Sequence, residues 1–193
     1  MLNLKLATDP RWANLAVISI ADILSDHAYC EQKAASSCIS IIQQFPDKEI
    51  LVEQLAPIVS EEWSHFRLVL KELKKRGLKL APQRKDHYVN QLLKIQRKGI
   101  SREDLLLEKL LTAALIEARS CERFRLLSLH LHDNDLRKFY HHFMVSEAGH
   151  YVLFIDLAKH YADEKTVTAR WHQYVDAETE ILNNIQLRGD RIH

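Results

Sequence analysis

The chain has 193 residues, of which 47% are hydrophobic and 27% charged, and its formal net charge is +1. This length suits one well-buried domain, with or without an appendage, and no apolar run approaches the ~20 residues of a membrane span. The N-terminus lacks a basic region followed by an apolar stretch and a cleavage site, so we expect no secretory signal. The three cysteines form no Cys-x-x-Cys pattern, which fits a reducing compartment. We therefore expect a single-domain protein, residues 1–193, in the cytoplasm and outside the membrane.

Helix signals begin at Asp9-Pro10, where Asp9 is a suitable N-cap and Pro10 a suitable first helical residue. Apolar and small residues then recur at steps of three and four, which predicts one helix over about residues 10–45. Glu31 falls on that apolar stripe. Pro46 should end the helix, because the residue before a proline disfavours helical backbone.

A second helix is predicted over about residues 48–76, with a kink or interruption at Pro57 and a stop at Gly77. The connection that follows is the least regular part of the chain. It carries the signal of a short helix over about residues 86–98, ended by Gly99.

The second half of the chain predicts three further helices. Ser101 with Asp104 resembles a capping box, and Asp163 is a suitable N-cap. The predicted ranges are about 102–131, 135–161 and 164–188. Two helical hairpins joined by a long connection predict an all-α, ferritin-like four-helix bundle with a long crossover and an extra C-terminal helix.

Two copies of one pattern carry the chemistry, each a glutamate followed about 30 residues later by Glu-x-x-His. The intervals from the first glutamate to the second are 31 and 30 residues. On a helix, residues three apart project from one face, so each Glu-x-x-His presents a carboxylate and an imidazole together. This is the ligand pattern of carboxylate-bridged two-metal sites in four-helix bundles, and its oxygen and nitrogen donors favour iron or manganese over structural zinc. The predicted metal ligands, which are also the catalytic residues, are Glu31, Glu62, His65, Glu117, Glu147 and His150.

A single Glu-x-x-His is usually a surface ion pair, so the prediction depends on the repetition of the pattern. Burying four acids without a cation would cost several kcal/mol each. Glu122 competes with Glu117 as a ligand, but its interval to Glu147 is 25 residues. It also lies about 140° around the helix from Glu117, which therefore remains the preferred ligand.

Residues near these six positions are candidates for orienting the imidazoles, although packing or exposure explains each of them equally well. They are Glu61, Ser146, Asp26, Arg119 and Tyr29. The other histidines lack a paired motif, and we predict structural or surface roles for five of them: His27, His87, His130, His141 and His142.

The net charge hides a basic segment, which we define as Arg67–Lys98. It contains eleven lysines and arginines against two acids, a net charge of +9, so the remainder of the chain carries −8. A basic stretch on an otherwise acidic protein indicates a polyanionic partner, or else a solvated helix end and linker.

The runs Asp26-His27-Ala28-Tyr29-Cys30-Glu31, Glu62-Trp63-Ser64-His65 and Ser146-Glu147-Ala148-Gly149-His150 give the chain a family resemblance. It resembles the tRNA 2-methylthio-N6-isopentenyladenosine hydroxylases over nearly its whole length. The resemblance implies a non-haem di-iron monooxygenase that uses O2 to hydroxylate the isopentenyl group of a modified adenosine beside the tRNA anticodon. It also implies that the same six residues bind two iron ions.

A tRNA substrate would need phosphate-neutralising surface, which the basic segment can supply. The predicted RNA-binding residues are Lys74, Lys75, Arg76, Lys79, Arg84 and Lys85. Since the chain has no flavin, nicotinamide or iron–sulfur signature, we expect an external electron donor, a separate reductase. Two other functions stay open: another ferritin-like activity, such as peroxide disproportionation at manganese or iron oxidation, and a non-enzymatic helical RNA-binding module.

Overall fold

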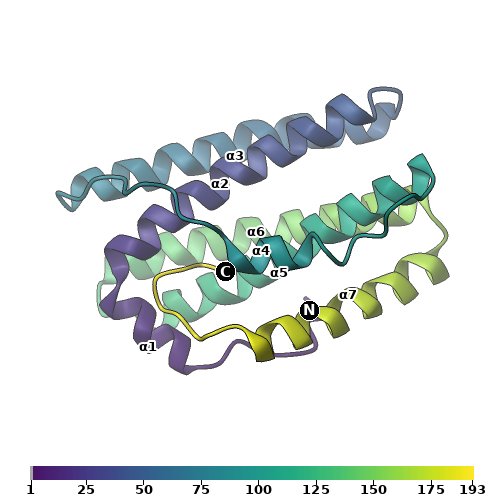
Figure 1. The fold of residues 1–193 in the computed structure, drawn as a ribbon. Helices are drawn as coiled ribbons and strands as arrows, with labels where there is room; N and C mark the ends of the chain where they lie inside the picture. The colour runs from purple at the N-terminus through teal and green to yellow at the C-terminus, as the bar shows by residue number, and fades with distance from the viewer. Residues whose placement is uncertain (1) are drawn as a thin grey trace. The chain divides into compact units, whose positions relative to one another are not determined.

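The computed structural model describes residues 2–193, in which every regular element is helical (Figure 1). This confirms the all-α prediction. No helix within this range is long and apolar enough to cross a membrane. The helices are α1 Arg11–Ile18, α2 Ile20–Gln44, α3 Glu49–Lys75, α4 His87–Leu92, α5 Arg102–His130, α6 Asn134–Tyr161 and α7 Glu164–Asn184.

The chain divides into two compact units. The smaller unit comprises Ile18–Lys85 and Arg188–Ile192, and therefore contains the α2–α3 hairpin. The larger unit comprises the residues through Val17, Asp86–Leu187 and His193. It contains the α5–α6 hairpin together with α4 and α7.

In the smaller unit, α2 ends at the predicted proline turn, and Phe45 is buried there. The helix α3 continues through Pro57, so the predicted interruption is absent. It ends at Lys75, and the predicted stop residue Gly77 follows the cap residue Arg76 with φ +69°. The amide of Leu78 donates to Leu73 O at 2.9 Å and that of Gly77 to Lys74 O at 3.0 Å. These two bonds form a Schellman motif, whose left-handed position favours glycine.

Residues 188–192 bind back onto this hairpin. Arg191 Nη1 donates to Asp26 Oδ1 and the Ile192 amide to Asp26 Oδ2, each at 2.8 Å. Arg84 Nη1 donates to Asp190 Oδ2 at 2.7 Å. The buried carboxylate of Asp26 is therefore satisfied by a segment from the far end of the chain.

The predicted helix over about 10–45 is wrong at Ser19, where the structure has a turn between α1 and α2. The local sequence Val17-Ile18-Ser19-Ile20 combines β-branched residues with a serine, and these have modest helix propensity. The backbone at Ser19 has φ −108° and ψ 32°, and its carbonyl accepts the Ile23 amide at 3.0 Å. The break therefore starts a new helix, with Ser19 as the cap residue of α2.

In the larger unit, side-chain caps start α4, α5, α6 and α7, and the caps of α5 and α7 are the two that the sequence predicts. The Ser101 hydroxyl accepts the Asp104 amide at 3.0 Å, and Asp163 Oδ1 accepts the Thr166 amide at 3.0 Å. Asp133 Oδ1 caps α6 by accepting the Leu136 amide at 3.1 Å. The hairpin core contains an aromatic cluster in which Phe124 of α5 contacts Tyr140 and Phe143 of α6. Helix α7 contacts α4, α5 and α6.

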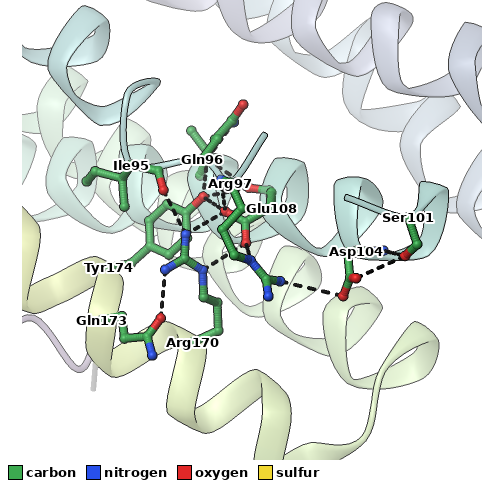
Figure 2. A network of polar contacts seen from close by, with 10 residues as sticks. Ile95, Gln96, Arg97, Ser101, Asp104, Glu108, Arg170, Gln173 and Tyr174 are labelled. Atoms are coloured by element: carbon green, nitrogen blue, oxygen red, sulfur yellow. Dashed lines mark hydrogen bonds and ion pairs between the residues drawn. The ribbon is translucent and has the colours of Figure 1, made fainter. Parts of the chain in front are cut away.

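Two predicted helices are shorter than expected, and a polar network explains the first (Figure 2). Helix α4 ends at Leu92, well before the predicted residue 98, because side chains of α5 and α7 bind the backbone that follows. Arg170 of α7 donates to the Ile95 carbonyl at 2.8 Å, and Glu108 of α5 accepts the Arg97 amide at 3.4 Å. Helix α7 ends at Asn184 and not at 188, after two asparagines, which are poor helix formers.

Candidate metal centre

The α2–α3 hairpin brings together the first three predicted ligands. Glu31, Glu62 and His65 are at most 3% exposed, and each offers one ligand atom within 4.8 Å of the others. His65 Nδ1 lies 3.4 Å from Glu31 Oε2 and 3.8 Å from Glu62 Oε2. We call this group the α2–α3 triad. It contains two carboxylates and one imidazole.

The imidazole of His65 has one nitrogen on each side of the triad. Nδ1 faces the two buried carboxylates, whereas Nε2 lies 3.7 Å from Oε1 of the half-exposed Glu61. This orientation makes Nδ1 the atom available to a metal. Glu61 therefore lies beside the histidine of its own helix, where its charge favours a proton on Nε2.

The α5–α6 hairpin brings the other three predicted ligands together in the same way. Glu117, Glu147 and His150 are at most 6% exposed, and each offers one ligand atom within 4.8 Å of the others. His150 Nδ1 approaches Glu147 Oε2 at 3.2 Å. We call this group the α5–α6 triad. It has the same donor set as the first.

The thiol of Cys121 lies beside the α5–α6 triad but outside its cluster of ligand atoms. Burial, followed by the charges of Glu147, Glu122 and Glu117, raises the pKa of Cys121 to about 12. Its sulfur donates to the Met144 carbonyl at 3.2 Å. The ligand atoms clustered in the triad are therefore oxygen and nitrogen.

The competing residue Glu122 is engaged elsewhere in the larger unit. Its Oε2 accepts the Thr8 amide at 3.0 Å and forms a close ion pair with Arg119. Arg119 also makes a bidentate pair with buried Glu178, at 2.8 and 2.9 Å. Glu117, which shares the buried cluster with Glu147 and His150, is therefore the better ligand candidate.

The spacing of donor atoms within each triad fits a shared metal ion. Two ligands about 2.1 Å from one metal lie roughly 3 to 3.4 Å apart at octahedral to tetrahedral angles. The His150–Glu147 and His65–Glu31 separations of 3.2 and 3.4 Å match this range. Two buried carboxylates in one small cluster also need a nearby positive charge, which a divalent cation supplies.

Sequence reasoning missed one residue of the α2–α3 cluster, His27. Its Nε2 lies 2.6 Å from Glu31 Oε1, and its side chain has no exposed surface. The sequence does contain a histidine and a glutamate four residues apart, at His27 and Glu31. We did not assign His27 to the metal centre because it is not part of a Glu-x-x-His motif. Two of the other orienting candidates bind different groups: Asp26 binds Arg191, and Tyr29 donates to the Ala81 carbonyl. Ser146 is half-buried, and its orienting role stays a prediction.

The basic segment contains both exposed and ion-paired residues. Arg76 Nε lies 2.7 Å from Glu72 Oε1, and Arg84 is bound to Asp190, so both guanidinium groups have protein partners. Four of the six predicted RNA-binding residues are exposed lysines: Lys74, Lys75, Lys79 and Lys85. Trp63, which entered the sequence analysis only as part of a motif, is 48% exposed, and its ring lies tilted against that of Phe66 with the centroids 4.9 Å apart.

Comparison with known proteins gives consistent matches over nearly the whole chain. A family model described as tRNA-(ms2io6A)-hydroxylase (MiaE) matches residues 2–193. Two curated relatives carry the name tRNA 2-(methylsulfanyl)-N(6)-isopentenyladenosine(37) hydroxylase. That of Pseudomonas putida is 35% identical over 178 residues, 92% of this chain and 85% of the relative. That of Salmonella typhimurium is 33% identical over 133 residues, 68% of this chain and 47% of the relative.

A solved structure also matches closely. It is titled "Protein 43 with aldehyde deformylating oxygenase activity from Synechococcus" and is 33% identical, with a TM-score of 0.92. The match covers 98% of this chain and 94% of the other. This similarity to a ferritin-like oxygenase confirms the predicted fold class.

Proposed function

The chain belongs to the MiaE family of tRNA-(ms2io6A) hydroxylases, and on that premise we propose its substrate and its metal centre. The substrate is tRNA carrying 2-methylthio-N6-isopentenyladenosine beside the anticodon, and the reaction hydroxylates the isopentenyl group. Two buried triads with matching donor sets, one in each helical hairpin of a member of this hydroxylase family, are the observation that carries the proposal. Because the proposed substrate is a tRNA, we propose that the protein acts in the cytoplasm.

The six triad residues are the proposed ligands of two iron ions: Glu31, Glu62, His65, Glu117, Glu147 and His150. Four carboxylates balance the charge of two divalent cations. The two imidazoles each have Nδ1 facing a carboxylate of their own triad. Carboxylate and imidazole donors suit iron or manganese, and hydroxylation with O2 favours iron.

When bound, the iron pair supplies the reduction of O2: one oxygen atom enters the C–H bond and the other leaves as water, with two electrons and two protons consumed. The electrons come from an external donor, a separate reductase in our proposal. The protein binds the metals, fixes the orientation of both imidazoles and buries the ligand atoms away from bulk water. The Glu61 carboxylate, beside His65 Nε2, helps to hold a proton on the nitrogen that faces away from the triad.

The basic segment is the proposed binding surface for the tRNA backbone. Lys74, Lys75, Lys79 and Lys85 are exposed and can approach phosphates directly. Arg76 and Arg84 belong to the same proposed surface, but their ion pairs lower their net contribution. Single-stranded loops allow a base to be splayed out and stacked on an aromatic side chain. Exposed Trp63 lies on the helix that carries Lys74 and Lys75, where it can serve this purpose.

The test measures metal content and the optical spectrum of the aerobically purified protein, followed by nucleoside analysis of tRNA after reaction with O2 and a reductant. We expect about two irons per chain, oxo-bridge absorption in the near ultraviolet, and the hydroxylated nucleoside. Glu62→Ala should lose both metal and product. Glu53→Ala, which removes an exposed acid of the same helix, should retain both.

Other metal contents lead to other conclusions. Two manganese ions with peroxide disproportionation and no hydroxylated nucleoside would replace the proposal with the manganese alternative. A protein that stays metal-free after anaerobic reconstitution with ferrous iron would refute the metal centre itself.

A further inference from the structure

We infer that His27 is a positioning residue that fixes how Glu31 binds its metal. The inference rests on the proposed function, because it assumes that Glu31 is a ligand. It adds His27 to the residues of the metal centre and assigns it a role through Glu31, without contact between His27 and the metal.

The contact between His27 and Glu31 is short and buried. Nε2 of His27 lies 2.6 Å from Oε1 of Glu31, and the two side chains are 0% and 4% exposed. The residues are four apart on α2, so they occupy adjacent turns of one helix face. A polar contact this close between a buried imidazole and a buried carboxylate is not screened by water, so it holds the two groups together more strongly than it would at the surface.

This contact gives the two oxygens of Glu31 different neighbours. Oε1 lies 2.6 Å from His27 Nε2, while Oε2 lies 3.4 Å from Nδ1 of His65, at a spacing that suits two ligands of one metal. Glu31 would therefore bind through Oε2 alone, on the metal that His65 would hold. Without His27, Oε1 would be free to chelate the same metal and take up one more coordination position. Keeping a position open distinguishes catalytic from structural metal sites.

Two amide substitutions separate this role from simple core packing. The side-chain nitrogen of glutamine can occupy the place of a histidine Nε2, whereas that of asparagine reaches only the place of Nδ1. His27→Gln should therefore keep a polar contact with Oε1 of Glu31, and His27→Asn should lose it. Both variants carry the same polar group, which makes each a control for the other.

The measurement is anaerobic titration of the metal-free proteins with Co²⁺, followed by its visible absorption, which reports coordination number. Wild type and His27→Gln should bind two Co²⁺ ions with similar affinity and similar spectra. In His27→Asn, one of the two sites should bind about 10- to 100-fold more weakly, which is the usual cost of removing a group that orients a metal ligand. The absorption of that site should change in intensity. Thermal unfolding of the metal-free variants checks that both are folded.

Three results would overturn the inference. Equal binding by His27→Gln and His27→Asn, at wild-type strength, would show that the contact does not act on the metal, while leaving the proposed metal centre intact. Loss of a site in His27→Gln as well would show that the imidazole is itself a ligand, and this comparison holds even if His27→Asn does not fold. If wild type bound neither Co²⁺ nor Fe²⁺, the proposed function would fail together with the inference.

Discussion

Replacing Glu108 with glutamine should strongly lower the free energy of unfolding of the protein, although Glu108 is not one of the proposed metal ligands. Glu108 is fully buried near the start of α5 (Figure 2). Arg170 donates to both of its carboxylate oxygens, at 2.8 and 2.7 Å, and Tyr174 donates to Oε2 at 2.8 Å. Glu108→Gln preserves the shape of the side chain but leaves the largely buried guanidinium of Arg170 without its counterion.

The expected magnitude follows from the burial of each partner. Breaking a buried ion pair by removing one member costs about 3 to 5 kcal/mol. For a chain of this length, 1 kcal/mol corresponds to roughly 2 to 4 °C in Tm, so the midpoint should fall by about 6 to 20 °C. Arg97 also donates to Glu108, at 2.7 Å, but its side chain is 42% exposed. Arg97→Ala should therefore cost at most about 1 kcal/mol.

The dependence on pH provides a second readout. Burial raises the pKa of Glu108, but hydrogen bonds from Arg170, Tyr174 and Arg97 lower it more, so its pKa in the folded protein lies below the ordinary value of 4.5. A depressed folded-state pKa stabilises the protein above the pKa of the unfolded chain, and that stabilisation is lost as the pH falls through the folded-state pKa. The difference between wild type and Glu108→Gln should therefore be constant near neutral pH and shrink below about pH 4.5.

Urea denaturation of the metal-free proteins at pH 7 and at pH 3.5 measures both effects. The exposed acid Glu103, in the first turn of the same helix, provides the control substitution Glu103→Gln, which should change stability little. The reasoning is refuted if Glu108→Gln costs no more than Arg97→Ala at pH 7.

Three further predictions concern the metal centre and the tRNA surface. Glu147→Ala should remove one or both metals while the metal-free protein stays folded; a purely ion-pairing role would leave the purified protein metal-free with or without the substitution, which metal analysis decides. Changing the four exposed lysines to glutamine should make the slope of log affinity for tRNA against log salt concentration shallower. The expected change is about 0.7 to 0.9 for each phosphate that is no longer neutralised. An unchanged slope would show that the tRNA binds elsewhere on the protein. These lysines are Lys74, Lys75, Lys79 and Lys85. Trp63→Ala should weaken binding of an anticodon stem–loop by about 1 to 3 kcal/mol if a base stacks on the ring; unchanged binding would count against that role.

Local signals in the sequence predicted most helix ends correctly. Ser101, Asp163 and Gly77 act as caps in the structure because a cap is a contact between residues close in sequence. The break at Ser19 was missed because β-branched residues lower helix propensity by only a few tenths of a kcal/mol, which is too little to override a continuous apolar pattern. The early end of α4 could not be predicted from the sequence either. It depends on Arg170, a residue 75 positions away from Ile95.

The membership of the triads was predictable because the spacing of a metal-binding helix pair repeats in the sequence. The contacts that individual side chains make within and around the triads were less predictable. The contact of His27 with Glu31 is local, yet an isolated i, i+4 pair is common on helices and gains meaning only from full burial. The preference for Glu117 over Glu122 became firm only when Glu122 was found paired with Arg119 and Thr8. The second of these partners is 114 residues away in sequence.

The binding of residues 188–192 onto the first hairpin has a consequence for protein synthesis. Asp26 is made 165 residues before its partner Arg191. At about 5 to 20 residues per second, the ribosome needs roughly 10 to 30 s to cover that distance. During this interval the Asp26 carboxylate has no access to these two donors and stays hydrated. It can bind Arg191 and the Ile192 amide only after both residues have been made and have left the ribosome.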